Sequence, residues 1–178
     1  MDNGASSYRR FLNGDETAFD ALIKEYFNSL VFFINRYVKD NSAAEDIAID
    51  TFSDLIVNKG RYNFKVSFKT YLFMIGRSRA LNYIKRRNRI KFEELNEGVS
   101  ECSDALEAVI KNETAVMVNN ALKELPEEMR IAVHLVYFEE LSYSDAARVM
   151  KKNKKQVDNL LYRAKEKLRT VLGREELL

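Results

Sequence analysis

The chain has 178 residues, of which 46% are hydrophobic, so it can bury one sizeable core or two small ones. It contains one proline and six glycines, which leaves few breaks between periodic segments and favours long helices over short strands. The net charge of +2 is too small to indicate nucleic-acid binding by itself. These properties predict an all-α protein and argue against a disordered one.

The sequence lacks the usual signals of export and of membrane insertion. It does not open with a basic stretch followed by an apolar run, and no apolar stretch approaches the length of a transmembrane helix. Cys102 is the single cysteine, which excludes an intramolecular disulfide. We therefore expect a cytoplasmic protein without membrane insertion.

Start signals predict three long helices in the N-terminal half. Asp15 is a suitable N-cap for an amphipathic helix that reaches Val38. A capping box that begins at Ser42 predicts a second helix, which should end within residues 58–60. A third helix is predicted to follow Ser67 and to continue into a cluster of basic residues.

Charge is segregated around the end of this third helix. Residues 77–91 contain seven basic side chains and no acid, whereas residues 92–113 contain seven acids and one lysine. Tyr71 and Phe73 precede the basic run, so aromatic faces for unstacked bases lie close to cations for a nucleic-acid backbone. Three apolar residues of the same helix are expected in the core: Phe68, Leu72 and Ile75.

The C-terminal half has the pattern of a helix-turn-helix. Periodicity is lost over about residues 89–103, which predicts a flexible acidic linker. A capping box at residues 104–107 begins the second unit, and Pro126 suits the first position of its next helix. Three helices should follow, the first marked by Ile131, Leu135 and Phe138, the second over residues 142–150 and the third over 153–172.

The last of these helices has two different faces, and Asn153 with Gln156 forms its capping box. The side chains expected to pack are Val157, Leu161, Ala164 and Leu168. The opposite face carries amide, aromatic and cationic groups: Lys155, Gln156, Asn159, Tyr162 and Arg163. Amides can bond to adenine edges, arginine can read guanine and lysine can neutralise phosphates, so this face suits DNA.

On these residues the chain resembles the small two-domain sigma factors of the extracytoplasmic-function type, over nearly its whole length. The segments that carry the resemblance are residues 44–52, 68–87, 125–130, 141–147 and 157–165. The resemblance implies an alternative sigma factor that binds core RNA polymerase and directs promoter-specific initiation by reading −10 and −35 elements. It also implies two small helical domains, residues 8–90 and 107–178, joined by a flexible linker over 91–106.

The resemblance further assigns roles to individual residues. Contact with the polymerase falls to Glu45, Asp46, Asp50 and Phe52, while Ile49 stands where the family usually has glutamine. The −10 element would be bound by Tyr71, Arg77, Ser78, Asn82, Lys85, Arg86 and Arg87. The −35 element would be bound by Lys154, Lys155, Gln156, Asn159, Tyr162 and Arg163. The implied partners are promoter DNA, the clamp helices of the largest polymerase subunit, the polymerase flap and an anti-sigma factor.

Two other classes of binding protein remain open at this point. An autonomous helix-turn-helix regulator would use the N-terminal helices to dimerise or to sense a ligand, and a helical adaptor would bind only proteins. An enzyme is disfavoured, because the single histidine, His134, lies among apolar residues and no glycine-rich phosphate loop or Cys/His metal spacing occurs. We expect no catalytic residues, no metal site and no cofactor.

Overall fold

Every regular element in the described part of the chain is helical. The computed structural model describes residues 3–93, 118 and 120–175. Contacts divide the chain into an N-terminal unit, Met1–Ala105, and a C-terminal unit, Leu106–Leu178. The all-α prediction is therefore confirmed over the described residues, and none of their helices is long and apolar enough to cross a membrane.

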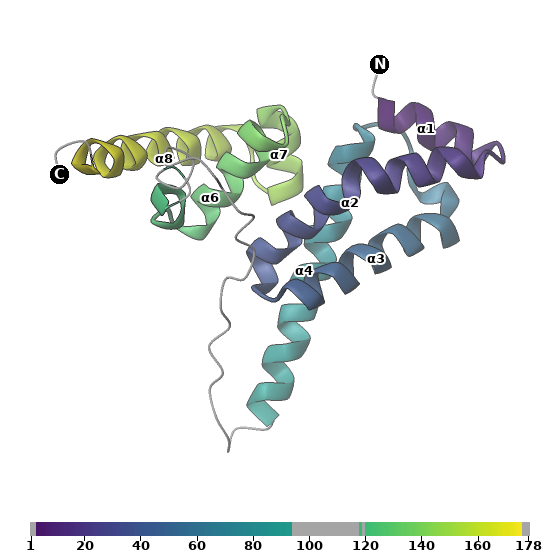
Figure 1. The fold of residues 1–178 in the computed structure, drawn as a ribbon, viewed down its shortest axis with the longest axis horizontal. Coiled ribbons are helices and arrows are strands. Elements are labelled where there is room, and N and C mark those ends of the chain that lie inside the picture. Colours follow the sequence, from purple (N-terminus) through teal and green to yellow (C-terminus); the bar gives the residue numbers. More distant parts are fainter. Residues whose placement is uncertain (1–2, 94–117, 119, 176–178) are drawn as a thin grey trace. The chain divides into compact units, whose positions relative to one another are not determined.

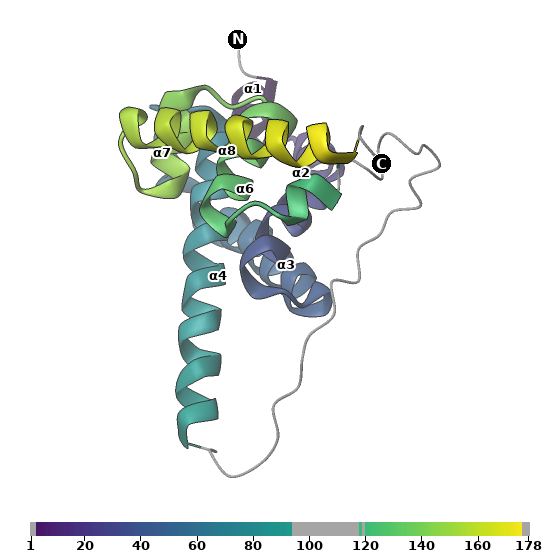
Figure 2. The same cartoon turned by 90° about the vertical axis from the view of Figure 1, so that its left-hand side faces the viewer.

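The N-terminal unit is built around its second helix. Its elements are α1 (Asn3–Leu12), α2 (Glu16–Val38), α3 (Asn41–Val57), the 3-10 turn η1 (Lys59–Arg61) and α4 (Phe68–Glu93). α2 packs against α1, α3 and α4 (Figure 1). The C-terminal half of α4 extends beyond the other helices of this unit (Figure 2), which leaves its basic turns open to solvent.

Helix α1 was not predicted from the sequence. Its Tyr8 side chain is fully buried, and the phenol donates its proton to the carbonyl oxygen of Leu55 at 2.9 Å, with the carbonyl oxygen of Lys59 at 3.2 Å as a second acceptor. The helix has ten residues, too few for its apolar spacing to stand out in the sequence. Its stability therefore comes from packing on the unit, not from a local signal.

The predicted start of α2 is confirmed, whereas that of α3 is wrong. Asp15 accepts a hydrogen bond from the backbone N–H of Ala18, as expected of an N-cap. α3 is capped by Asp40, which accepts from the N–H of Ala43 at 3.1 Å, and Ser42 already lies in the first helical turn. Lys39 ends α2 in the left-handed conformation, with φ of 53°, so the chain reverses at once and Asp40 comes first in the extended conformation.

An aromatic contact and a glycine bring α4 close to α2. Phe33 and Phe73 are fully buried, and their ring centroids are 4.8 Å apart. One turn further, a Cβ added to Gly76 would lie 2.8 Å from Cδ1 of Leu30. The two helices thus come too close at Gly76 for a Cβ to fit without movement of Leu30.

The buried face of α4 differs from the predicted one at two positions. Phe68 and Leu72 are fully buried as expected, but Ile75 is only half-buried. Phe73, which we expected to offer an aromatic face to DNA bases, is also fully buried. Because α4 packs against both α2 and α3, its core face extends around to Phe73 and Gly76 and leaves Ile75 at the edge.

The C-terminal unit contains the predicted helix-turn-helix. Its described elements are α6 (Glu127–Val133), the π-helical turn η2 (His134–Phe138), α7 (Tyr143–Met150) and α8 (Lys154–Glu175). Both α6 and α7 pack against α8. Pro126 lies one position before the predicted one, at the N-cap of α6. The capping box expected at residues 104–107 lies outside the described residues.

The π-helical turn changes which side chains of the first helix are buried. Ile131 and Leu135 are in the core as predicted, but Phe138 is 59% exposed. Each π turn adds a residue to the helical repeat, so Phe138 rotates away from the face that Leu135 occupies. The spacing argument for Phe138 was therefore wrong, although the helix itself was predicted correctly.

Candidate protein and nucleic-acid interfaces

Helix α3 presents an acidic face to solvent. Glu45, Asp46 and Asp50, three of the four residues expected to bind polymerase, are exposed on it. The fourth, Phe52, is only 4% exposed, and its ring centroid lies 6.1 Å from that of Phe19 and 6.3 Å from that of Phe27. Phe52 follows Ala48 by four residues on the buried side of α3. It therefore packs in the interior beneath the acidic face and cannot contact a partner directly.

Three apolar side chains accompany the acids, and two of them were not anticipated. Ile49 is 53% exposed, Ile56 is 44% exposed and Val57 is 79% exposed. Ile49 and Ile56 are seven residues apart and therefore lie on the same side of α3. Exposed apolar residues bordered by charges are typical of protein interfaces. Their spacing on the polar side of a helix was the sequence signal that could have identified them.

The exposed face of α4 contains most of the residues expected to bind the −10 element. Ser78, Asn82, Lys85 and Arg86 are exposed at spacings of three or four residues, so they form one continuous strip. Phosphates can bind to the two cations, while the shorter polar side chains can reach base edges. Four of the seven predicted residues thus lie on a single accessible surface.

The other three residues of α4 that were predicted to bind the −10 element are half-buried. Arg77 keeps part of its surface accessible. Arg87 reaches back to the end of α2, where Nη1 lies 3.5 Å from the carbonyl oxygen of Val38. Tyr71 stacks on Tyr62 with ring centroids 4.9 Å apart, and burial raises the pKa of the Tyr71 hydroxyl. These side chains therefore combine packing with partial accessibility, which spacing alone did not predict.

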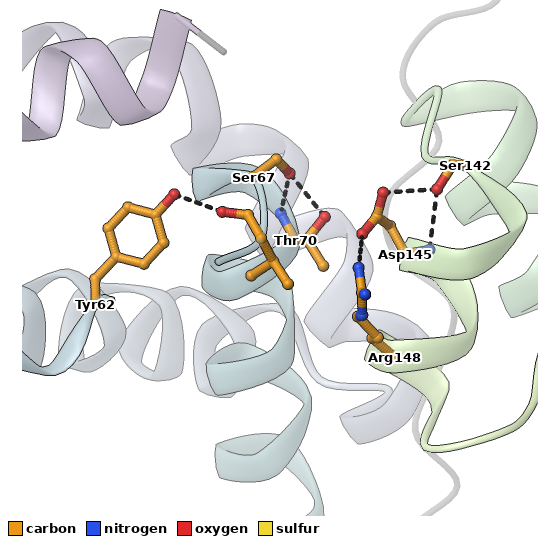
Figure 3. Close-up of polar contacts among 7 residues, drawn as sticks. Tyr62, Ser67, Thr70, Ser142, Asp145 and Arg148 are labelled. Carbon is orange, nitrogen blue, oxygen red and sulfur yellow. Dashed lines mark hydrogen bonds and ion pairs between the residues drawn. The ribbon is translucent and has the colours of Figure 1, made fainter. Parts of the chain in front are cut away.

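The connection into α4 is held by side-chain hydrogen bonds. The Tyr62 hydroxyl donates to the carbonyl oxygen of Val66 at 2.7 Å, and Ser67 Oγ accepts from the N–H of Thr70 at 3.0 Å (Figure 3). The Ser67 and Thr70 hydroxyls are also 2.7 Å apart. α4 thus begins after Ser67 as predicted, with Ser67 as its cap, and the loop before it has a defined shape.

This loop and α1 border a cavity of about 270 Å³. Phe64 lines it in the left-handed conformation, with φ of 59°, and the Arg9 guanidinium carbon lies 4.6 Å from the centre of the Phe64 ring. Ser6 and Tyr62 line other walls. Because the cavity combines a cation, hydroxyls and aromatic rings, it suits a planar polar group such as a base. The cavity could not be predicted from the sequence, because α1 was not predicted.

In the C-terminal unit, the first turn of α8 is closed by the predicted capping box. The N–H of Gln156 donates to Asn153 Oδ1 at 2.8 Å, and the N–H of Asn153 donates to Gln156 Oε1 at 2.8 Å. Every residue expected to bind the −35 element is exposed on α8: Lys154, Lys155, Gln156, Asn159, Tyr162 and Arg163. The packing face is also as predicted, with Val157, Leu161 and Ala164 buried and Leu168 half-buried.

Contacts before α8 set the geometry of the turn. Ser142 caps α7, and Asp145 joins its hydroxyl, at 2.6 Å, to Nη1 of Arg148, at 2.9 Å (Figure 3). Lys152, in the turn between α7 and α8, forms an ion pair of 2.8 Å with Glu128 of α6. The helix that precedes the turn and the turn itself are therefore both tied by charged side chains.

The acidic side chains and the single histidine do not form a metal-binding group in the described residues. Groups of three or more His, Cys, Asp or Glu side chains placed to hold a metal do not occur in this part of the chain. His134 is 5% exposed, and its Nε2 lies 3.2 Å from Glu139 Oε1. The pair connects the two ends of the π-helical turn, so we interpret it as a contact that stabilises the turn.

Two family models match the chain in the order of its two units. "Sigma-70 region 2" covers residues 22–90, and "Sigma-70, region 4" covers residues 115–168. The first match contains α3 and the exposed strip of α4, and the second contains the helix-turn-helix. The exposed faces of α3 and α4 therefore fall inside the first matched region, and the exposed face of α8 falls inside the second.

Individual proteins give the same result. The RNA polymerase sigma-H factor of Pseudomonas aeruginosa is 29% identical over 168 residues, which cover 88% of this chain and 87% of the relative. The ECF RNA polymerase sigma factor SigM of Bacillus subtilis is 23% identical, covering 87% of this chain and 95% of SigM.

Solved structures share the fold. The sigma factor RpoE of Bartonella quintana, in complex with the anti-sigma factor NepR, matches with a TM-score of 0.72 and 22% identity over 87% of this chain and 96% of RpoE. CnrH, in complex with the cytosolic domain of CnrY, matches with a TM-score of 0.61 and 19% identity over 97% of this chain and 96% of CnrH. With both regions present in order and ECF sigma factors as relatives, the chain belongs to the sigma-70 family and, within it, to the extracytoplasmic-function sigma factors.

Proposed function

We propose that this protein is an alternative sigma factor that binds core RNA polymerase and directs it to promoters through two DNA-binding helices. The observation that carries the proposal is the pair of accessible polar faces on α4 and α8, one in each matched region. Neither face offers many cations, so each alone should bind DNA weakly. When both faces are held in one polymerase complex, binding of one raises the effective concentration of the other at its DNA element. The complex therefore selects promoters in which the two elements are correctly spaced.

We further propose that the chain works as two domains with a linker between them. The first domain extends the expected segment 8–90 to residues 3–93, because α1 and α4 are continuous helices at its two ends. The expected second domain, 107–178, is kept, and the linker, expected over 91–106, begins after α4. Free of polymerase, the linker would let each domain bind its element separately. On the enzyme, the scaffold would fix their spacing.

The acidic and apolar face of α3 is our candidate for the polymerase contact. Glu45, Asp46 and Asp50 supply charge, and Ile49 supplies an apolar centre that can exclude water. This combination suits the clamp helices of the largest subunit, which the family resemblance implies as the partner. The C-terminal domain would dock on the flap, which places α8 upstream.

The DNA contacts are assigned to the two exposed faces. The strip of Ser78, Asn82, Lys85 and Arg86 would bind the separated −10 element, with Tyr71 and the cavity beside α1 offering aromatic surfaces to unstacked bases. The α8 face would enter the major groove at the −35 element, as recognition helices do.

Three further properties complete the proposal. The protein carries out no chemistry of its own, and it acts in the cytoplasm. It is held inactive by an anti-sigma factor that covers the polymerase-binding and DNA-binding faces. This last point is supported by the fold that it shares with RpoE, which was solved with the anti-sigma factor NepR.

Run-off transcription with core polymerase tests the proposal. The wild-type chain should form a stable complex with core and initiate at specific sites on genomic templates. Asp46→Ala should weaken core binding, whereas Asn159→Ala and Arg163→Ala should leave it intact and reduce initiation where a −35 element is required, by about fivefold to a hundredfold for loss of a base contact. No core complex and no specific initiation by the wild type would refute it. Binding of a symmetric duplex site without polymerase would favour the autonomous regulator.

A further inference from the structure

One carboxylate in the N-terminal unit receives donors from three places. Asp54 lies in the last turn of α3, and its side chain is 19% exposed. Its Oδ1 lies 3.4 Å from Nη2 of Arg79 on α4 and 3.6 Å from Nη1 of Arg61 in η1. The same oxygen accepts a hydrogen bond of 2.8 Å from Nδ2 of Asn58. A single acid therefore connects α3, the following turn and α4.

This cluster lies where the loop meets the DNA-binding helix. Asn58 is the C-cap of α3, and its backbone N–H donates to the carbonyl oxygen of Asp54 at 2.8 Å. The Asp54 charge is also close enough to Tyr71 to raise the pKa of that hydroxyl, after the larger effect of burial. The ion pair with Arg79 therefore holds the carboxylate beside α4.

The two arginines keep part of their surface free for another partner. The Arg79 side chain is 34% exposed and that of Arg61 is 65% exposed. A guanidinium has five N–H donors, and an ion pair with one shared oxygen leaves most of them unused. One acid between two cations also leaves a net positive charge. The remaining donors can therefore bind an anion such as a phosphate.

Orientation is the property that Asp54 adds. An unpaired surface arginine samples many rotamers, and this freedom is lost when it binds phosphate. Two arginines already held by one half-buried carboxylate lose less freedom on binding, because their side chains are largely ordered beforehand.

We propose that Asp54 is a positioning residue for promoter opening, which holds Arg61 and Arg79 toward the phosphate backbone of the separated strand at the −10 element. The inference rests on the proposed function of α4. It assigns a role in DNA binding to an acidic residue, which a charge argument would have excluded.

A simple counter-charge role makes the opposite prediction. If Asp54 only neutralised the arginines, its removal would add one positive charge and strengthen binding to DNA. If it positions them, its removal weakens opening despite the added charge. The sign of the effect therefore separates the two explanations.

The test is Asp54→Asn in the full chain with core polymerase, on a promoter that the wild-type holoenzyme opens. The amide retains an oxygen for Asn58 but loses the charge that holds the arginines. Asp20→Asn, at an exposed aspartate of α2, is the control for the change in charge. Opening is measured by permanganate reactivity of unpaired thymines, and core binding is measured on the same samples.

We expect Asp54→Asn to lower the fraction of opened promoter by about threefold to tenfold, as for the loss of two partly exposed ion pairs. Core binding should be unchanged, and Asp20→Asn should stay within about twofold of wild type on both measurements. Arg79→Lys, which keeps the charge but loses the forked donor, should lower opening in the same way. The double variant of Asp54→Asn and Arg79→Lys should open nearly the same fraction of promoter as Asp54→Asn alone, because both changes break the same contact.

Equal or greater opening by Asp54→Asn, with core binding intact, would overturn the proposal. If this variant lost core binding or thermal stability, Arg79→Lys would decide, and unchanged opening by that variant would overturn the proposal as well. Failure of the wild-type holoenzyme to open any promoter would contradict the proposed function itself. That outcome is distinct from failure of the further proposal, which is judged only from variants compared with an active wild type.

Discussion

Removal of the capping box at the start of α8 tests whether local hydrogen bonds set the stability of the recognition helix. Asn153→Ala deletes the side-chain oxygen that accepts from the N–H of Gln156 at 2.8 Å. The reciprocal bond, from the N–H of Asn153 to Gln156 Oε1, also measures 2.8 Å and loses its geometric support when the first turn frays. Both residues are exposed, so water partly replaces the lost partners.

The expected cost is about 1 kcal/mol, within the usual range of about 0.5–2 kcal/mol for loss of an N-cap side chain. For a unit of this size, a change of about 1 kcal/mol lowers the midpoint of thermal unfolding by roughly 4–8 °C. The N-terminal unit makes no use of this cap, so its unfolding should not change.

The assay is urea unfolding of the full chain followed by NMR, with separate resonances for the two units. Asn153→Asp is the matched control, because it keeps an acceptor and adds a charge that favours the helix N-terminus. A loss below about 0.3 kcal/mol for Asn153→Ala, or an equal loss in the N-terminal unit, would show that packing alone determines the start of α8.

Three further predictions concern the N-terminal unit. Phe52→Ala should destabilise this unit by about 3–5 kcal/mol, measured by urea unfolding, whereas Ile49→Ala should change its stability by no more than about 0.5 kcal/mol. Ile49→Ala should instead weaken binding to core RNA polymerase in a fluorescence titration. The opposite pattern would refute the assignment of Phe52 to the hydrophobic core and Ile49 to the surface. Gly76→Ala should cost about 1–3 kcal/mol, because its Cβ would lie 2.8 Å from a side chain of α2. Gly173→Ala, whose Cβ would meet nothing within 4 Å beyond its chain neighbours and its own helix backbone, should be neutral or slightly stabilising, and equal changes in the unfolding midpoint would contradict the close approach. Burial raises the pKa of Tyr8 from 10.0 to about 12, so the unfolded chain loses this proton first and the free energy of unfolding should fall as pH rises from 10 to 12. The slope should be smaller in Tyr8→Phe, measured by unfolding at each pH, and an unchanged slope would assign the effect to other groups.

Features that depend on neighbouring residues in the sequence were predicted well. The capping box of α8 requires two side chains three residues apart, and a helix that buries one narrow face leaves the other face exposed by geometry alone. The alternation of Val157, Leu161 and Ala164 with exposed polar residues is therefore visible without coordinates. The exposed strip on α4 follows from the same reasoning.

Features that depend on packing against two or more elements were not predicted. Phe73 is an apolar residue in an amphipathic helix, and spacing does not say whether the buried face of that helix is narrow or wide. α4 contacts both α2 and α3, so Phe73 is buried and Ile75 lies at the edge. The N-cap of α3 is Asp40 and not Ser42, because Lys39 ends α2 in the left-handed conformation and α3 begins directly after it. The capping-box motif at Ser42 did not reveal this.

The sequence by itself determined the all-α class, the helix-turn-helix, the two faces of α8 and the family, because each is encoded in periodicity, capping and the order of motifs along the chain. Only the tertiary structure decided that α1 completes the first unit, that Ile49 is exposed whereas Phe52 is buried, and that Asp54 joins Arg61 to Arg79. These contacts join residues that are distant in sequence. Their energies depend on which helix faces meet, and that choice is made by the packing of the whole unit.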